Sequence, residues 1–164
     1  MAERPEFASA KDAADDELIL AFGRLLGAAN RLEYILGRAL EQQCGITHLS
    51  YEVLLILGRA GQRGMSMRAV AQEQVLTTGG VTRLVDRMEA AGLVERAPDP
   101  DDRRGRLLRL TAEGEATARE ASTVHAENIR RYFVDPLPAA HRARFADDLR
   151  ILSHAARDAL PRLR

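Results

Sequence analysis

Residues 77 to 88 combine small side chains, arginines and a regular apolar spacing in one short segment. It opens with a run of small residues: Thr77, Thr78, Gly79 and Gly80. Glycines at a helix start cost about 1 kcal/mol each relative to alanine, so they are poor choices for stability alone. They let the backbone approach a partner closely, and a helix N-terminus favours phosphate. We interpret this run as a helix start that meets phosphate; the alternative is a local weakness tolerated by tertiary packing.

The rest of the segment has two faces at helical spacing. Its apolar residues recur at threes and fours and must point inward: Val81, Leu84, Val85 and Met88. The residues between them form an outward polar face: Thr82, Arg83, Asp86 and Arg87. Arginine forms paired hydrogen bonds with phosphates and with base edges. This face is the first candidate surface for DNA contact.

A second basic cluster follows in the loop Ala97–Gly105, which has an acidic first half and a basic second half. Asp102 can accept hydrogen bonds from backbone N–H groups and tighten the turn. The arginines project from the tip or the returning strand: Arg103, Arg104 and Arg106. An arginine on a thin hairpin can enter a narrow minor groove, where negative potential is concentrated. In isolation the loop would be interpreted as a self-neutralising charged turn; behind a helix pair it favours DNA contact.

Helical and extended patterns place these clusters in a fold that is mainly α with a small β-hairpin wing. We expect helices over residues 15–43, 50–59, 67–74, 78–91, 112–133 and 139–160, and strands over 93–96 and 106–111. Ser50, Ser66, Thr77 or Thr78, and Thr111 are the predicted N-caps. Gly45 and Gly92 are predicted to end their helices. Two short helices followed by a basic hairpin describe a winged helix-turn-helix.

The first and last helices carry apolar stripes that a small wing domain cannot bury alone. These stripes comprise Leu18, Phe22, Leu25, Ala29, Leu32, Leu36 and Leu40, and then Phe145, Leu149, Leu152 and Ala156. We therefore expect a homodimer. The predicted organisation is a flexible leader over 1–14 and a single domain over 15–160. Its dimerisation helices span about 15–43 and 112–160, and its winged helix-turn-helix spans about 50–111, with the helix-turn-helix at 66–91 and the wing at 93–111.

The run LTTGGVTRLVDRMEAAGLVERAPDPDDRRGRLLRLTAEG resembles the core of the MarR family of bacterial transcriptional regulators. The resemblance implies a homodimer in which the first, fifth and sixth predicted helices interlock. It also implies repression of genes by binding double-stranded DNA. Release by a small effector, aromatic or phenolic in many members, bound between the dimerisation and DNA-binding parts, is implied as well.

Carried over residue by residue, the resemblance gives Thr82 and Arg83 DNA contacts from the recognition helix. Arg87 would lie near phosphate or brace the wing, and Arg104, with Arg103 second, would enter the minor groove. Gln74 and the pair Gly79–Gly80 depart from the family pattern, which leaves open which bases are recognised. The full predicted DNA-binding set is Ser66, Thr77, Thr78, Gly79, Thr82, Arg83, Arg87, Arg103, Arg104 and Arg106.

Other classes of function find little support in the sequence. There is no run of about 18 apolar residues, no signal peptide and no enzyme motif, so we expect a non-enzyme without cofactor that does not enter membranes. The single cysteine, Cys44, predicts a reducing, cytoplasmic setting and does not match the position of redox-sensing cysteines in the family. The four histidines, His48, His125, His141 and His154, lack metal-ligand spacing, so no metal site is expected.

The net charge of zero is the one feature that favours a different class. DNA-binding domains usually carry a basic surplus, although a local basic patch is sufficient. The alternative is a winged-helix module that binds another protein and has no specific affinity for DNA. Binding to random duplex DNA at low salt distinguishes the two.

Overall fold

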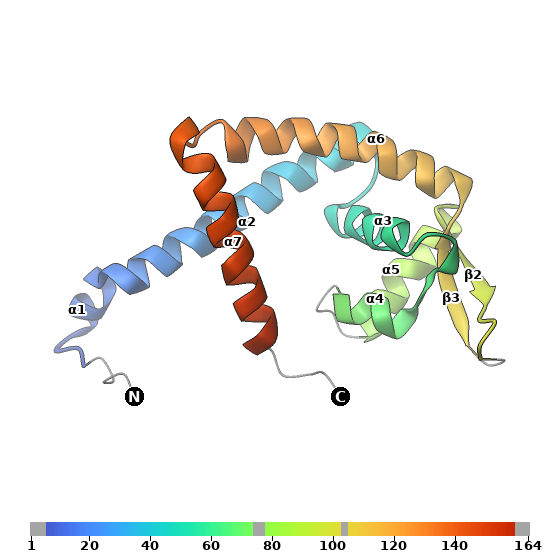
Figure 1. Cartoon of the computed structure of the whole chain (residues 1–164), viewed down its shortest axis with the longest axis horizontal. Coiled ribbons are helices and arrows are strands. Elements are labelled where there is room, and N and C mark those ends of the chain that lie inside the picture. The colour runs from blue at the N-terminus through green and yellow to red at the C-terminus, as the bar shows by residue number, and fades with distance from the viewer. Residues whose placement is uncertain (1–5, 74–77, 103–104, 160–164) are drawn as a thin grey trace. The chain divides into compact units, whose positions relative to one another are not determined.

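The computed structural model describes residues 6–73, 78–102 and 105–159, with only the backbone described at 78 and 79. The chain is mainly helical with one small antiparallel sheet, as predicted (Figure 1). Its elements in order are α1 Ala10–Asp15, α2 Glu17–Cys44, α3 His48–Ala60, the 3-10 turn Gly61–Arg63, β1 Met65–Ser66, α4 Met67–Glu73, α5 Thr78–Ala90, β2 Val94–Pro98, β3 Arg106–Leu110, α6 Ala112–Ile129, the π-helical segment Arg130–Val134, and α7 Ala139–Ala159.

The chain divides into two compact units, residues 1–35 and 36–164. In the first unit, α1 occupies part of the predicted leader and was not predicted from the sequence. It begins after Ser9, whose hydroxyl accepts a hydrogen bond from the Asp12 N–H at 3.1 Å. The apolar stripe of α2 is exposed in this unit: 79% of Leu18 and 60% of Phe22 are accessible. A single chain thus leaves much of this stripe uncovered.

The core lies in the second unit, where α3, α4, α5 and α6 pack with the sheet. The predicted inward face of α5 is confirmed, because Val81, Leu84, Val85 and Met88 are all buried. They pack with residues of α3, α4, the sheet and α6, which include Leu54, Leu57, Val70, Leu108 and Ala121. The buried side of α5 fixes which of its residues face solvent.

The sheet has the order β1-β3-β2, and every pair is antiparallel. The hairpin of β2 and β3 was predicted, and Val94 pairs with Leu110 at its base. Strand β1 was not predicted; its two residues pair with Leu107 and Leu108. Gly64 allows this pairing, because its φ is +73° and an added Cβ would lie 2.5 Å from the Leu108 carbonyl oxygen.

Most predicted helix ends agree with the structure. Gly45 and Gly92 have φ values of +68° and +74°, as expected for left-handed caps. The cap of α3 differs, because the Thr47 hydroxyl, not that of Ser50, accepts a backbone hydrogen bond, from the Ser50 N–H at 3.1 Å. The helix predicted to continue to residue 133 is α-helical only to Ile129 and then becomes a π-helix.

Helix α7 follows the π-helical segment, and the two are joined by the rings of Phe133 and Phe145, whose centroids are 5.9 Å apart. The predicted apolar stripe is only partly covered. Phe145 and Leu149 are half-buried, whereas Leu152 is 56% exposed and Ala156 is also exposed. The exposure of these last two residues agrees with the expectation that the wing domain cannot bury this stripe alone. Their stripe needs a covering surface from outside this part of the chain.

Candidate nucleic-acid interface

The outward face of α5 carries the predicted polar residues. Thr82, Arg83, Asp86 and Arg87 are all exposed, opposite the buried stripe. Within the described part of the chain, Arg83 and Arg87 form no ion pair, so both guanidinium groups are available. The backbones of Thr78 and Gly79 lie in the first turn of α5, as expected for a helix start. Thr77 lies outside the described residues.

Ser66 lies at the other end of the helix-turn-helix. Its hydroxyl accepts a hydrogen bond from the Ala69 N–H at 3.2 Å and so caps α4, as predicted. The residue is exposed and ends strand β1. It is therefore positioned by the sheet and not by α5.

The wing is closed by contacts around Asp99 and Gly105. The Asp99 N–H donates to the Gly105 carbonyl at 3.2 Å, and the Gly105 N–H donates to the Asp102 carbonyl at 2.9 Å. The Asp99 carboxylate accepts from the Asp101 N–H at 2.9 Å. Arg106 starts β3, is exposed, and donates to the Gly105 carbonyl. Arg103 and Arg104 lie outside the described residues.

Arg96, which the sequence did not single out, connects the wing to α5. From β2, its guanidinium donates to the carboxylates of Asp86 and Glu89, two residues one helical turn apart. The hydrogen bond to Asp86 is the main cause that raises the Arg96 pKa, burial opposes it, and the charges of Glu89 and Asp86 add to it. The left-handed turn at Gly92 sends β2 back beside α5, which is the sequence signal that could have revealed this contact.

The first turn of α6 packs directly against the turn between α5 and β2. The Thr111 hydroxyl donates to the Gly92 carbonyl at 2.5 Å, and the Thr111 N–H donates to the Leu93 carbonyl at 3.2 Å. The same hydroxyl accepts a hydrogen bond from the Gly114 N–H, so Thr111 caps α6, as predicted. A Cβ on Gly114 would lie 1.8 Å from the Leu93 oxygen. We call this contact the α5–α6 joint.

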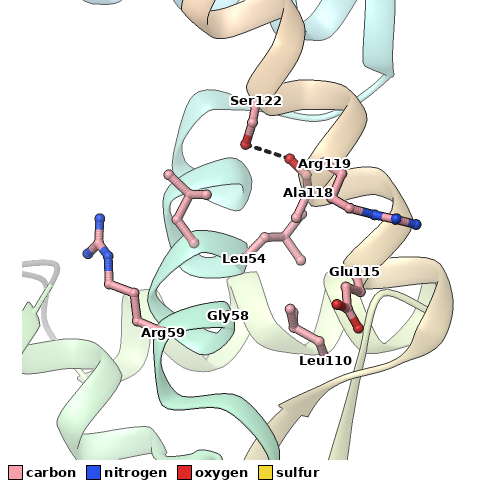
Figure 2. A pocket seen from close by; sticks show the side chains of 9 residues that line it. Leu54, Gly58, Arg59, Leu110, Glu115, Ala118, Arg119 and Ser122 are labelled. Carbon is pink, nitrogen blue, oxygen red and sulfur yellow. Dashed lines mark hydrogen bonds between the residues drawn. The ribbon is translucent and has the colours of Figure 1, made fainter.

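An open groove of about 470 Å³ lies between α3, α6 and the end of β3 (Figure 2). Its lining residues are Leu54, Leu55, Gly58, Arg59, Leu110, Glu115, Ala118, Arg119 and Ser122. Leucines and Ala118 supply apolar walls, while Arg59 extends from α3 and Arg119 from α6. The Ser122 hydroxyl donates to the Ala118 carbonyl at 2.7 Å and accepts from the Tyr51 hydroxyl at 3.1 Å. The groove can therefore hold an apolar ligand with a few polar groups.

Beside this groove, three rings gather between α3 and α6. The His125 ring centroid lies 5.2 Å from that of His48 and 4.8 Å from that of Tyr51. Burial lowers the pKa of His125, and the nearby His48 lowers it further. In the described ranges, no group of three or more His, Cys, Asp or Glu side chains has the geometry to hold a metal ion. Burial, with the charge of Glu120, raises the pKa of Cys44, which disfavours the reactive thiolate.

Comparisons with known proteins agree on one family. Residues 45–105 match the family model described as "MarR family". The multiple antibiotic resistance protein MarR of Salmonella typhimurium is 27% identical over 145 residues, which cover 87% of this chain and 93% of that protein. The chain belongs to the MarR family. Escherichia coli PapX is 37% identical over 70 residues, and there the match spans only 43% of PapX.

Solved structures of MarR-family proteins share the fold. Sco3205 from Streptomyces coelicolor, solved in complex with DNA, has a TM-score of 0.77 and 26% identity over 94% of this chain and 92% of its own. CouR from Rhodococcus jostii RHA1, solved with p-coumaroyl-CoA bound, has a TM-score of 0.66 and 30% identity over 85% of this chain and 92% of its own.

As a MarR-family protein, the chain is a DNA-binding transcriptional regulator with a winged helix-turn-helix. Its family and fold are those of regulators and not of enzymes. Helices α4 and α5 form the helix-turn-helix, and the β2–β3 hairpin forms the wing. No described helix combines the length and apolar character needed to cross a bilayer.

Proposed function

We propose that this MarR-family regulator is a homodimeric repressor that binds a pseudo-palindromic operator and leaves it when a small molecule binds. The exposed face of α5 is the observation that carries the proposal. Arg83 and Arg87 form no ion pair with any described residue, and they lie on the side of the helix opposite its buried stripe. That Sco3205 was solved with DNA supports the same use of the fold here.

Within this interface each residue has a proposed role. Thr82 and Arg83 read base edges from α5 in the major groove, and Arg87 contacts phosphate. Ser66, Thr77, Thr78 and Gly79 lie close to the sugar-phosphate backbone. Arg103, Arg104 and Arg106 contact DNA from the wing, with Arg104 in the minor groove.

The dimer is supported by the apolar surface that one chain leaves open. Exposed apolar side chains run along α2 and recur on α7, including Leu18, Phe22, Leu25, Ile151 and Leu152. Large exposed apolar side chains repeated along a helix in this way are typical of a protein–protein interface. Two-fold symmetry then presents two copies of α5 to half-sites about one helical turn, ~10–10.5 bp, apart.

We propose that the groove between α3 and α6 receives the effector. The resemblance implies an effector between the dimerisation and DNA-binding parts, and this groove is lined by α3, α6 and the end of β3. That CouR was solved with p-coumaroyl-CoA, which carries a phenolic ring, supports an aromatic or phenolic effector. Among the described residues no cluster has the geometry to hold a metal ion, and burial raises the pKa of Cys44, so neither feature supports a metal or an oxidant as the effector.

Two arginine substitutions test the DNA-binding surface. Footprinting of the promoter upstream of its own gene identifies the operator, and fluorescence anisotropy then compares operator with scrambled duplex at several salt concentrations. Arg83→Ala should cost about 1–3 kcal/mol on the operator and relax specificity at one position. Arg104→Ala should weaken binding to both duplexes. It should also reduce the slope of log K against log[salt] by about one.

Arg144→Ala is the control, because Arg144 is a highly exposed arginine on α7, outside the winged helix-turn-helix. It should bind both duplexes like the wild type. If neither Arg83→Ala nor Arg104→Ala changes the affinity or the salt slope, neither α5 nor the wing contacts DNA as proposed. The protein-binding alternative then takes the place of this model.

A further inference from the structure

Helix α5 carries two acidic side chains close to its basic ones. Asp86 is exposed between Arg83 and Arg87, and Glu89 follows one turn later, partly exposed. Two positive and two negative charges therefore cancel on this part of the helix. A bare carboxylate on a surface that meets phosphate is repulsive, and phosphate contacts dominate affinity for DNA. The acids need an explanation if α5 faces DNA.

Arg96 pairs with both acids at once. One terminal nitrogen of its guanidinium contacts Glu89 and the other contacts Asp86. The Arg96 side chain is 28% exposed, so it is the least accessible member of the trio. With Arg96 included, the five charges leave one net positive charge on the exposed region of α5. A lysine cannot bridge two carboxylates with the same fixed geometry.

The pairing is not needed to attach β2 to α5. The Leu93 N–H donates to the Met88 carbonyl at 2.9 Å, and the side chains of Leu93 and Val94 are buried in the core. Exposed ion pairs contribute little to stability compared with such contacts. The consequence of the Arg96 contacts is therefore mainly electrostatic.

We propose that Arg96 is a positioning residue of the DNA interface, which draws Asp86 and Glu89 toward the wing and offsets one of their two negative charges, so that α5 with Arg83 and Arg87 meets phosphate as a net basic surface. The inference rests on the DNA-binding surface proposed above. Arg96 acts through the two acids and makes no phosphate contact of its own. Loss of Arg96 leaves the carboxylates of Asp86 and Glu89 without this partner, but it removes no contact with DNA.

The test compares full-length Arg96→Gln with the wild type on a random duplex at about 10 mM salt, where the Debye length is about 30 Å. Loss of the guanidinium lowers the local charge by one unit, and one unit charge about 8 Å from a phosphate in water changes binding by a little over twofold, so Kd should rise about twofold. The salt slope should stay at the wild-type value. Adding Asp86→Asn and Glu89→Gln to Arg96→Gln removes two negative charges and should lower Kd to the wild-type value or below it.

Arg38→Gln is the matched control, because it removes another exposed ion pair, Arg38–Glu41 at 3.1 Å on α2, and should leave Kd unchanged. Circular dichroism checks that every variant is folded. Should Arg96→Gln unfold, Arg96→Lys replaces it, with a smaller rise in Kd that the same two acid substitutions abolish.

Two results overturn the inference while leaving DNA binding intact. One is an unchanged Kd for Arg96→Gln. The other is a salt slope lowered by about 0.9 with no recovery from the acid substitutions, which would mean that Arg96 itself contacts phosphate. A wild-type protein that does not bind the duplex refutes the proposed function instead.

Discussion

Gly114→Ala tests the packing of the α5–α6 joint. The added Cβ would lie 1.8 Å from the Leu93 carbonyl oxygen and 2.8 Å from its carbon. Real Cβ contacts essentially never fall below 3.0 Å, so the two backbones must separate by more than 1 Å. The neighbour is backbone and cannot rotate away, which places the overpacking cost near ~3 kcal/mol. The shift also disrupts the hydrogen bond from Thr111 to Leu93, worth ~1 kcal/mol.

The higher helix propensity of alanine stabilises the folded state by at most about 1 kcal/mol, which offsets part of this cost. We therefore expect Gly114→Ala to lower the free energy of unfolding by about 3 kcal/mol. Urea denaturation followed by circular dichroism measures this, at one fixed protein concentration because a dimer links stability to concentration. Gly58→Ala is the matched control: its Cβ would meet only the Leu110 side chain at 3.8 Å, so it should gain up to about 1 kcal/mol. A Gly114→Ala protein within about 0.5 kcal/mol of the wild type would refute the reasoning.

Three further predictions address assembly, operator and pH. Light scattering at micromolar concentration should give about twice the chain mass of 18.1 kDa, and a stable folded monomer contradicts the dimer. Inserting about 5 bp between half-sites turns them to opposite faces of the duplex and should abolish tight binding; unchanged affinity argues against symmetric recognition. Because burial lowers the pKa of His125, the unfolded chain binds this proton more readily, so stability should fall as pH drops below about 6.5, by at most about 1.4 kcal/mol per pH unit. His125→Gln should flatten that slope in urea titrations at pH 7.5 and 5.5, and an unaltered slope excludes His125 as its source.

Local sequence signals predicted the local structure well. The spacing of Val81, Leu84, Val85 and Met88 fixed the buried face of α5 because a helix repeats every 3.6 residues, whatever surrounds it. Gly92 and Thr111 marked element ends because their backbone and side-chain preferences act within a few residues. These features need no knowledge of distant contacts.

Features that depend on how the elements pack against one another were missed. Strand β1 is two residues long and exists through its pairing with Leu107 and Leu108, about forty residues later. The contact of Arg96 with Asp86 and Glu89 depends on how β2 turns back along α5. Both are products of tertiary packing and leave no periodic pattern. The DNA-contact roles of all the predicted site residues stay predictions, and Thr77, Arg103 and Arg104 also lie outside the described part of the chain.

The α5–α6 joint couples a movement of α6 to a movement of α5, the proposed recognition helix. Helix α6 has 18 residues and so is about 27 Å long. The hydrogen bonds from Thr111 to the carbonyls of Gly92 and Leu93 couple the start of α6 to the turn that follows α5. A tilt of about 5° moves its far end by about 2 Å over that length, and the near end turns the recognition helix with it. In the proposed dimer, side chains along α6 would therefore influence the distance between the two α5 helices, and substitutions along α6 should change half-site spacing without altering any residue proposed to read a base.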